Sequence, residues 1–289
     1  MKQKHRFLTA LCLALFLLLC AAACPAEEAQ GETTPSEGAQ PEQAYSRTIT
    51  IDGFGDFVYY AQNDPDWDRS LYEPRFSKNY RVMHGGGCAP TAAAIAIANL
   101  LTPQELPALL EQAADPETGF PYCPCAVNAF DHHGSEHGIT DPRTPEDFLA
   151  ALPVILASYA TGNNAQGLVL RKRDGFGTST LIFETLANAY GLTYRGYSGW
   201  ENALAVLHSG GMVVTCVTKG IFTSSSHFMV IAAADEDYIY ILDPFMRESY
   251  ERDTSHLLEV VEPGLVRGRT KDVLRLGLSS FYTMKRPEE

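Results

Sequence analysis

The chain has 289 residues, and 45% of them are hydrophobic, so it is long enough to bury a sizeable core. Its 35 acidic residues outnumber its 22 basic ones and give a formal net charge of −13. Nucleic acids and anionic lipid headgroups are bound through clustered Lys and Arg, so this acidic balance disfavours both as partners.

The first 24 residues have the order of a bacterial export signal. Three basic residues precede an apolar run over residues 7–19, and three alanines then lead to Cys24. The run is shorter than the roughly 20 residues that a membrane-spanning helix needs. The alanines before Cys24 resemble a lipobox, so we expect cleavage there and a lipid on Cys24 as the only membrane attachment. An ordinary secretory signal is the alternative, and both place the protein outside the cytoplasm, on the outer side of the membrane or secreted.

Residues 25–45 contain one aromatic residue and no aliphatic residue larger than Ala, which is too little apolar surface to offset the cost of ordering the chain. We expect this segment to be a disordered tether. Residues 46–289 contain no internal repeat and no second linker, so they are predicted to form one domain, which we expect to be a monomer. Without the three basic residues of the leader, 19 basic residues face 35 acidic ones and the net charge becomes −16.

The first predicted elements of this domain are a strand and three helices. The run DFVYYAQ from Asp56 is rich in β-favouring residues and predicts a strand. A helix is expected directly after Cys88. Thr102 and Glu105 have the spacing of a capping box at the start of a second helix, and Thr144 repeats this start signal for a third.

Two more helices and three strands complete the prediction. The helices are STLIFETLANAY, which Gly191 ends, and WENALAVLHSG, which Gly210 ends. The runs MVVTCV, HFMVIAAA and YIYIL are β-branched or aromatic and are separated by turn residues, which is typical of one antiparallel sheet. The predicted fold class is therefore α+β, with N-terminal helices packed on a C-terminal antiparallel sheet.

Cys88 lies in the sequence GGGCAPTAAAIAIANLL, at the predicted start of a helix whose first turn holds Pro90. Unpaired N–H groups and the helix macrodipole favour negative charge at such a position, so the thiol is expected to ionise readily. The preceding glycines permit a sharp turn, and the alanines allow the helix to sit deep among other elements. The alternative is an inert structural cysteine, because cysteine is among the residues most often buried.

A base for this thiol is predicted at His227. If ADED forms a hairpin turn centred near Asp235, His227 falls almost opposite Asp243, and directly opposed residues have Cβ atoms about 4.5–5.5 Å apart. The carboxylate would then hold one nitrogen of the ring, and the other nitrogen would face the thiol. The alternative is a structural histidine and a turn-forming Asp-Pro. His84 is a weaker candidate, because it lies in the flexible glycine segment with no nearby acid to orient it.

Three stretches in order, YYAQNDPDW, GGGCAPTAAAIAIANLL and HFMVIAAADEDYIYILDP, resemble the papain-fold cysteine peptidases related to those that cut double-glycine leaders from bacteriocin precursors. This is family thirty-nine of the cysteine peptidases, and the likeness is to its stand-alone extracellular members. It covers most of residues 56–244. The resemblance implies a papain-like fold, with Cys88 as nucleophile, His227 as general base, Asp243 as its orienting acid and Gln62 as an oxyanion-hole donor. We expect no cofactor.

The chain departs from the family pattern at two positions. Ala89 and Ser226 stand where the family usually has glycine, after the cysteine and before the histidine. The serine run that ends at Ser226 is expected to narrow the approach to the base and so to influence substrate choice. Residues 117–174 carry no motif that matches the family and are expected to shape the cleft.

Residues 123–137 hold two cysteines and three histidines, which raises the question of a metal site. Zinc sites usually have two to four residues between paired cysteines, whereas one residue separates Cys123 from Cys125. A strained disulfide or two ordinary thiols is therefore favoured over a metal. Cys216 lies within an apolar strand and is expected in the core.

These observations predict a cell-surface cysteine hydrolase that cleaves peptide or isopeptide bonds in an extracellular protein or in a peptidoglycan stem peptide. Acyl transfer by the same triad is the closest alternative, because water and an amine attack the same thioester. A peptide-binding module that has lost turnover and a structural surface lipoprotein are the non-enzymatic alternatives.

Overall fold

The computed structural model describes residues 45–65, 67–68, 83–106, 152–157, 159–160, 170 and 177–288. All of them belong to one compact unit that runs from Ala44 to Glu289. The predicted signal over residues 1–24, with Cys24, lies outside the described residues, as does the predicted tether except for Tyr45.

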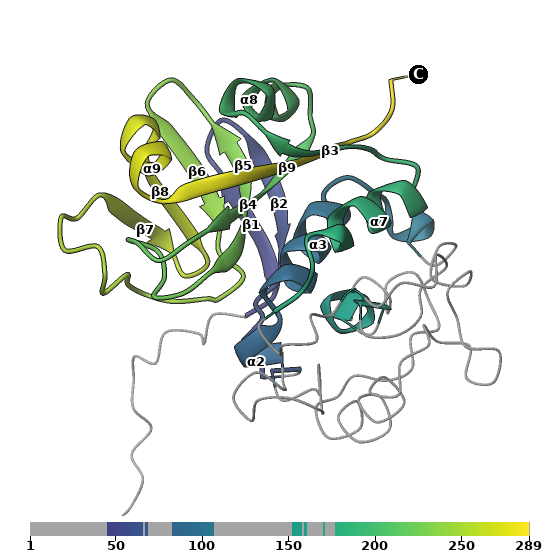
Figure 1. Ribbon diagram of the computed structural model, residues 1–289, viewed down its shortest axis with the longest axis horizontal. Coiled ribbons are helices and arrows are strands. Elements are labelled where there is room, and N and C mark those ends of the chain that lie inside the picture. The colour runs from purple at the N-terminus through teal and green to yellow at the C-terminus, as the bar shows by residue number, and fades with distance from the viewer. Residues whose placement is uncertain are drawn as a thin grey trace, which may run out of the picture. The chain divides into compact units, whose positions relative to one another are not determined.

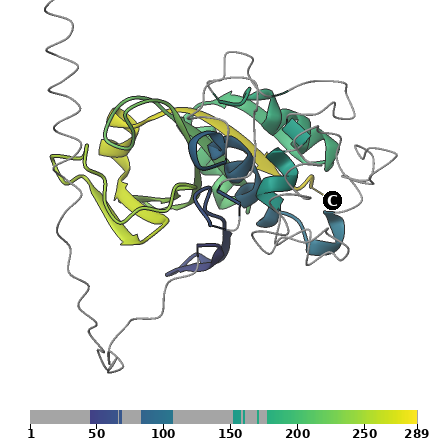
Figure 2. The ribbon, with the colours of Figure 1, turned by 90° about the horizontal axis from the view of Figure 1, so that it is seen from below.

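A seven-stranded antiparallel sheet forms the centre of the unit (Figure 1). Its strands, in spatial order, are β3 (Thr193–Ser198), β9 (Leu278–Lys285), β4 (Met212–Val217), β5 (His227–Ala234), β6 (Tyr238–Leu242), β8 (Leu265–Arg269) and β7 (Leu258–Glu262). The hairpin of β1 (Arg47–Ile51) and β2 (Gly55–Tyr59) forms a separate two-stranded sheet. Figure 2 shows from below how strongly the large sheet curves.

Both faces of the sheet are buried, and β5 contributes to each in alternation. Phe228, Val230 and Ala232 belong to a core shared with α3 (Cys88–Ala98) and α7 (Leu181–Ala189). Met229 and Ile231 belong to a second core, on which α8 (Trp200–His208) and α9 (Thr270–Leu276) pack. Because successive side chains of a strand point to opposite faces, β5 lies between two layers of helices. This explains why all eight of its residues are buried.

Helix α3 is enclosed by other elements, and its composition allows this. It contacts β5, β4, β2 and α7, and every residue from Ala89 to Ile97 is buried. Alanine side chains permit a close approach on all sides, and they lose no rotamer freedom in a helix. The sequence that begins at Cys88 therefore fixes the position of this helix against the sheet strand that carries His227.

The predicted α+β class and most predicted elements are confirmed. The expected strands at β2, β4, β5 and β6 form, and α3, α7 and α8 lie where helices were expected. Gly191 and Gly210 follow α7 and α8 with φ of 64° and 78°, as helix-ending glycines do. Thr102 and Glu105 form the predicted capping box, around the 3₁₀ helix η2 (Pro103–Glu105). The rest of that helix and Thr144 lie outside the described residues; residues 152–157 and 159–160 are helical.

The order of helices first and sheet second is only approximate. β1 precedes every described helix, and β9, near the C-terminus, pairs with both β3 and β4 inside the large sheet. β1, β3, β7, β8, β9 and α9 were not predicted. None of the helices described here is both long and apolar enough to cross a membrane.

Gly264, between β7 and β8, provides a test of close packing in this fold. It has φ of +93°, and a Cβ atom placed on it would lie 2.5 Å from Cζ of Tyr59. We expect Gly264→Ala to lower the free energy of unfolding by about 3 kcal/mol, because it adds backbone strain to overpacking. Gly210→Ala, which has positive φ but open space around it, should cost about 1 kcal/mol. Urea denaturation of both variants measures the difference, and equal losses would contradict the packing argument.

Candidate active site

Cys88 is the first residue of α3, as predicted, and its side chain is half-buried. The preceding residue must be glycine for a packing reason. A Cβ atom on Gly87 would lie 2.6 Å from the carbonyl oxygen of Met83 and 2.8 Å from its Cε. Residues Met83–Gly86 form the short helix α2, so the glycine run is a compact turn of helix followed by α3.

His227 begins β5, and Asp243 follows the last residue of β6. The Nε2 atom of His227 lies 2.6 Å from Oδ1 of Asp243, and their side chains are only 9% and 1% exposed. Both groups are therefore shielded from water where they meet. The predicted contact between this imidazole and this carboxylate is confirmed.

The reason given for that contact was partly wrong. Val230 pairs with Leu242 and Ile231 with Ile241, and the register shifts by one between Ile231 and Ala233. Extended by one residue, this pairing places Asp243 opposite Met229 rather than His227. His227 is then a diagonal neighbour on the same face, still within reach of a long side chain. The turn and the irregularity in β5 set this register, and neither was visible in the periodic pattern.

Cys88 meets the other side of the imidazole. Its thiol interacts electrostatically with the His227 side chain, and each of the two groups shifts the pKa of the other. Because Nε2 is occupied by Asp243, this leaves Nδ1 to face the sulfur. The three predicted side chains thus form a continuous chain from sulfur to ring to carboxylate.

The charges of the pair shift both pKa values in the direction that favours a thiolate and an imidazolium. Burial raises the pKa of the Cys88 thiol, but the hydrogen bond and positive charge of His227 outweigh it and lower the pKa below its ordinary value of 9.0. Backbone N–H groups of Phe228 and Ala89 add to this lowering. Burial lowers the pKa of His227, but the charge and hydrogen bond of Asp243, together with Cys88, raise it to about 9.

Asp243 is held by several donors that the sequence analysis did not identify. Its Oδ2 accepts a hydrogen bond from the Tyr250 hydroxyl at 2.7 Å and lies 3.0 Å from Nε of Arg247. Its Oδ1 accepts the backbone N–H of Phe245 at 2.8 Å. Burial raises the pKa of Asp243, but His227, Arg247 and Tyr250 together lower it below its ordinary value. A buried carboxylate so compensated stays ionised and in place.

The sequence did contain a signal for these donors. Arg247 and Tyr250 follow Asp243 by four and seven residues in the stretch DPFMRESY. A cation and a hydroxyl on a short loop that returns past a buried carboxylate are suitable partners for its second oxygen. The strand pattern ends at Asp243, so the path of the loop could not be read from periodicity.

Gln62 is buried and connects the two halves of the site. Its Nε2 donates to the carbonyl oxygen of His84 at 2.7 Å, and its backbone N–H donates to the carbonyl of Pro244 at 2.6 Å. An amide nitrogen carries two hydrogens, so one donor is used by His84 and one remains. The described residues offer no hydrogen-bond partner to Oε1 of Gln62. The structure therefore ties Gln62 to the segments that precede Cys88 and follow Asp243.

His84 differs from the prediction in its surroundings. It lies in α2, and its Nδ1 is 3.6 Å from Oδ2 of Asp68. The expectation that no acid lies nearby was wrong, because Asp68 comes from a loop sixteen residues earlier in the sequence. The side chain of His84 is half exposed, and the thiol of Cys88 interacts with His227 instead.

Of the three other cysteines in the predicted domain, the structure describes Cys216. Cys216 is half-buried in β4 and packs against the core, as expected. Cys123 and Cys125 lie outside the described residues, as does most of the segment 117–174. Among the residues that the structure describes, no group of three or more His, Cys, Asp or Glu side chains is placed to hold a metal ion.

Comparison with known proteins adds no relative: the chain matches no protein-family model and no curated protein. The geometry of Cys88, His227, Asp243 and Gln62 is therefore what indicates the function of the chain.

The ionisation of Cys88 can be measured directly. We expect the thiolate absorbance of wild type, taken as the difference from Cys88→Ala, to titrate below pH 9. In His227→Ala the burial of the sulfur remains while its cation is lost, so the titration should move above the ordinary pKa. His84→Ala is the matched control and should leave the titration in place. Identical curves for the two histidine variants would show that His227 does not stabilise the thiolate.

The hydroxyl of Tyr250 should contribute to stability at neutral pH and to resistance against acid unfolding. Because Asp243 has a lowered pKa in the folded state, its contribution is present above about pH 4 and is lost as the pH falls through the lowered value. Tyr250→Phe removes a donor to this carboxylate, so we expect a loss of about 2 kcal/mol at neutral pH and an acid-unfolding midpoint at higher pH. Urea denaturation at neutral pH measures the first, and circular dichroism during an acid titration measures the second.

The control for this variant is Tyr238→Phe, because no hydrogen bond of the Tyr238 hydroxyl is found among the described residues and the ring stacks on Arg267. It should unfold at the wild-type pH. Equal shifts in the two variants would contradict the role assigned to Tyr250.

Proposed function

We propose that the protein is a cysteine hydrolase that cleaves peptide or isopeptide bonds through a thioester intermediate. The observation that carries the proposal is the chain of contacts from Cys88 to His227 to Asp243, with the sulfur at a helix start and the carboxylate buried. Nucleophile, base and orienting acid in hydrogen-bond contact are what acyl transfer by a thiol requires.

We further propose that the domain is papain-like and related to the peptidases that its motifs resemble. The features that support this are a helix that begins with the cysteine, packed on an antiparallel strand that begins with the histidine. The acid lies at the end of the neighbouring strand, in the same order along the chain as in that family. Gln62 precedes all three, also as the resemblance implies.

In the first step the thiolate of Cys88 attacks the carbonyl carbon of the substrate, and the carbonyl oxygen gains negative charge. The free N–H of the Gln62 amide and the backbone N–H of Cys88 stabilise this oxyanion, and one such donor contributes about 3 kcal/mol. The C–N bond then breaks, and the imidazolium of His227 gives its proton to the leaving amine. A thioester on Cys88 remains, and His227 is neutral.

In the second step water attacks the thioester carbon while neutral His227 takes a proton from it. The C–S bond breaks, the acid product leaves, and the sulfur returns to its thiolate form beside the imidazolium. Asp243 keeps the ring oriented in both steps and stabilises its positive charge without accepting the proton. An amine in place of water would make the same triad a transpeptidase, and products formed in the presence of added amine distinguish the two reactions.

The setting of the reaction follows from the predicted export signal. We propose action outside the cytoplasm, on a protein or on a peptidoglycan stem peptide. If the protein has no turnover, the site would instead serve to bind a peptide. Labelling of Cys88 by a thiol-directed probe that is lost in His227→Ala favours the enzyme.

Hydrolysis is tested with a mixture of synthetic peptides and purified peptidoglycan fragments, with products identified by mass spectrometry. Cys88→Ala should abolish cleavage and leave the circular dichroism spectrum unchanged. Gln62→Ala should lower kcat by about 100-fold or more, because one oxyanion donor is lost. Cys216→Ala, the matched cysteine variant, should retain wild-type turnover. Cleavage that persists in folded Cys88→Ala would refute the proposed mechanism.

A further inference from the structure

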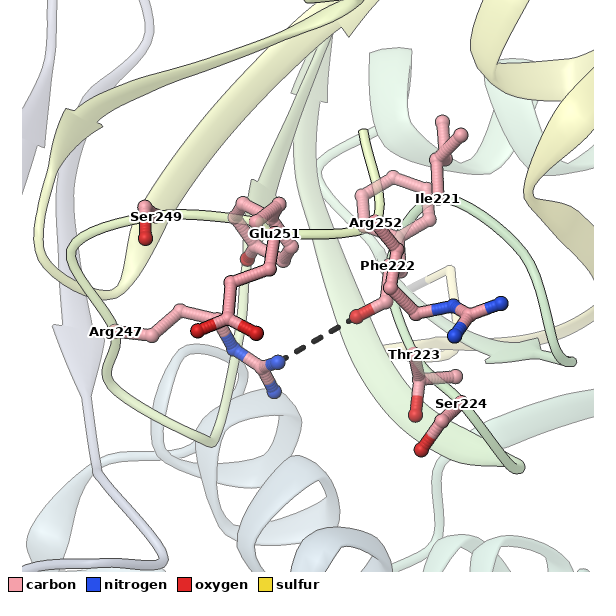
Figure 3. Close-up of a pocket in the computed structure, with 9 residues that line it drawn as sticks. Ile221, Phe222, Thr223, Ser224, Arg247, Ser249, Glu251 and Arg252 are labelled. Carbon is pink, nitrogen blue, oxygen red and sulfur yellow. Dashed lines mark hydrogen bonds between the residues drawn. The ribbon is translucent and has the colours of Figure 1, made fainter. Parts of the chain in front are cut away.

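A hollow of about 350 Å³ lies between two segments of the chain, one before His227 and one after Asp243 (Figure 3). One wall is the segment 221–224, which precedes His227 by a few residues. The other wall is formed by Arg247 and residues 249–252, and it includes Tyr250. Because Arg247 and Tyr250 both contact the Asp243 carboxylate, this hollow adjoins the triad on its carboxylate side.

The guanidinium groups in this hollow are anchored but not saturated. Arg247 uses Nε for Asp243 and Nη1 for the carbonyl oxygen of Phe222 at 3.4 Å, the dashed line in Figure 3. Arg252 uses Nε for the carbonyl oxygen of Gly220 at 3.0 Å. Each of these side chains therefore has its position fixed by the protein and keeps further N–H donors for a ligand. Guanidinium groups with paired N–H donors are suited to carboxylates.

The remaining groups limit what such a ligand can be. Thr223 and Ser224 add hydroxyls to one wall, and Glu251 adds a carboxylate to the other. The charge of Arg247 is already opposed by Asp243, so Arg252 and Glu251 are the remaining charged residues that line the hollow. A doubly charged phosphate would meet the carboxylate of Glu251. A single carboxylate that lies toward Arg252 and the hydroxyls avoids this repulsion.

The position of the hollow indicates which part of a substrate would reach it. Going outward from the sulfur of Cys88, the order of groups is His227, Asp243 and then Arg247. The leaving amine lies over His227, because this residue supplies its proton. Residues 221–224, which form one wall of the hollow, lead directly into His227, the residue that supplies this proton. The hollow is therefore on the side of the leaving amine.

We propose that this hollow is a substrate subsite that binds a peptide carboxylate on the leaving-amine side of the cleaved bond. The carboxylate belongs either to an acidic side chain or to the C-terminus of the peptide, and Arg252 is the residue that selects it. Glu251 excludes ligands of higher negative charge. The inference rests on the proposed function, because it takes the substrate to be a peptide held over Cys88.

The test uses full-length Cys88→Ala protein, immobilised, and a pool of synthetic nonapeptides. In the first pool each peptide has an amidated C-terminus and is made in two versions, one with Glu and one with Gln. In the second pool the peptides contain Gln only, and each is made with a free and with an amidated C-terminus. Mass spectrometry gives the ratio in which the two members of each pair are retained. The first pool reports an acidic side chain and the second a terminal carboxylate.

We expect one pool to show retention of the acid over the amide by about threefold, as is typical of an ion pair partly exposed to water. Adding Arg252→Gln should remove the preference, and adding Glu251→Gln should increase it. The matched control Arg275→Gln alters an exposed arginine of α9 outside the hollow and should keep the preference. Equal retention of acid and amide in both pools, or a preference that survives Arg252→Gln, would overturn the subsite.

Failure of the subsite and failure of the proposed function give different results. Wild-type protein incubated with the same pools reports cleavage separately. Cleavage without any charge preference leaves the hydrolase in place and removes the subsite. A charge preference that depends on Arg252 without cleavage supports the subsite in a peptide-binding protein and argues against the hydrolase.

Discussion

The constraint on which the site depends is the burial of an ionised carboxylate. Asp243 is almost completely enclosed, and an isolated charge in such a place would cost many kcal/mol. The protein compensates it with the imidazole of His227, the hydroxyl of Tyr250, the guanidinium of Arg247 and a backbone N–H. Removal of any one donor leaves the others in place but weakens the compensation. Asp243 is therefore fixed by more contacts than the imidazole of His227 beside it.

This compensation also organises the chain around the site. Tyr59 donates its hydroxyl to the carbonyl oxygen of Asp243, and Gly264 accepts the backbone N–H of Asp243. Gln62 reaches Pro244 with its own N–H. The early hairpin, the segment that precedes α3 and the loop between β7 and β8 are thus all connected to Asp243 or Pro244, the two residues that follow β6. The contacts that bring Cys88, His227 and Asp243 together are therefore largely the same contacts that assemble the fold.

The sequence predicted the local parts of this site better than the distant ones. Cys88 at a helix start and the strands around His227 and Asp243 follow from local pattern, and the structure has them there. The register of the hairpin was missed because its turn, closed between Asp235 and Tyr238, is centred later than Asp235, and the added residue in β5 only partly offsets this. β9 was missed because its partners β3 and β4 precede it in the chain by many residues, and pairing over such a separation leaves no periodic signal. The same holds for Asp68 beside His84.

The pKa shifts of Cys88 and His227 oppose each other in their effect on stability. A raised pKa at His227 stabilises the fold below pH 6.5, and this contribution is lost as the pH rises to about 9. A lowered pKa at Cys88 stabilises the fold above 9.0 and loses that contribution as the pH falls through the lowered value. At pH values that are above both 6.5 and the lowered pKa of Cys88 but below about 9, the folded Cys88–His227 pair holds one proton, which is on His227. The unfolded pair also holds one, on Cys88. The number of protons bound by the pair is then the same in both states, so Cys88 and His227 together do not make the stability of the fold depend on pH across this range.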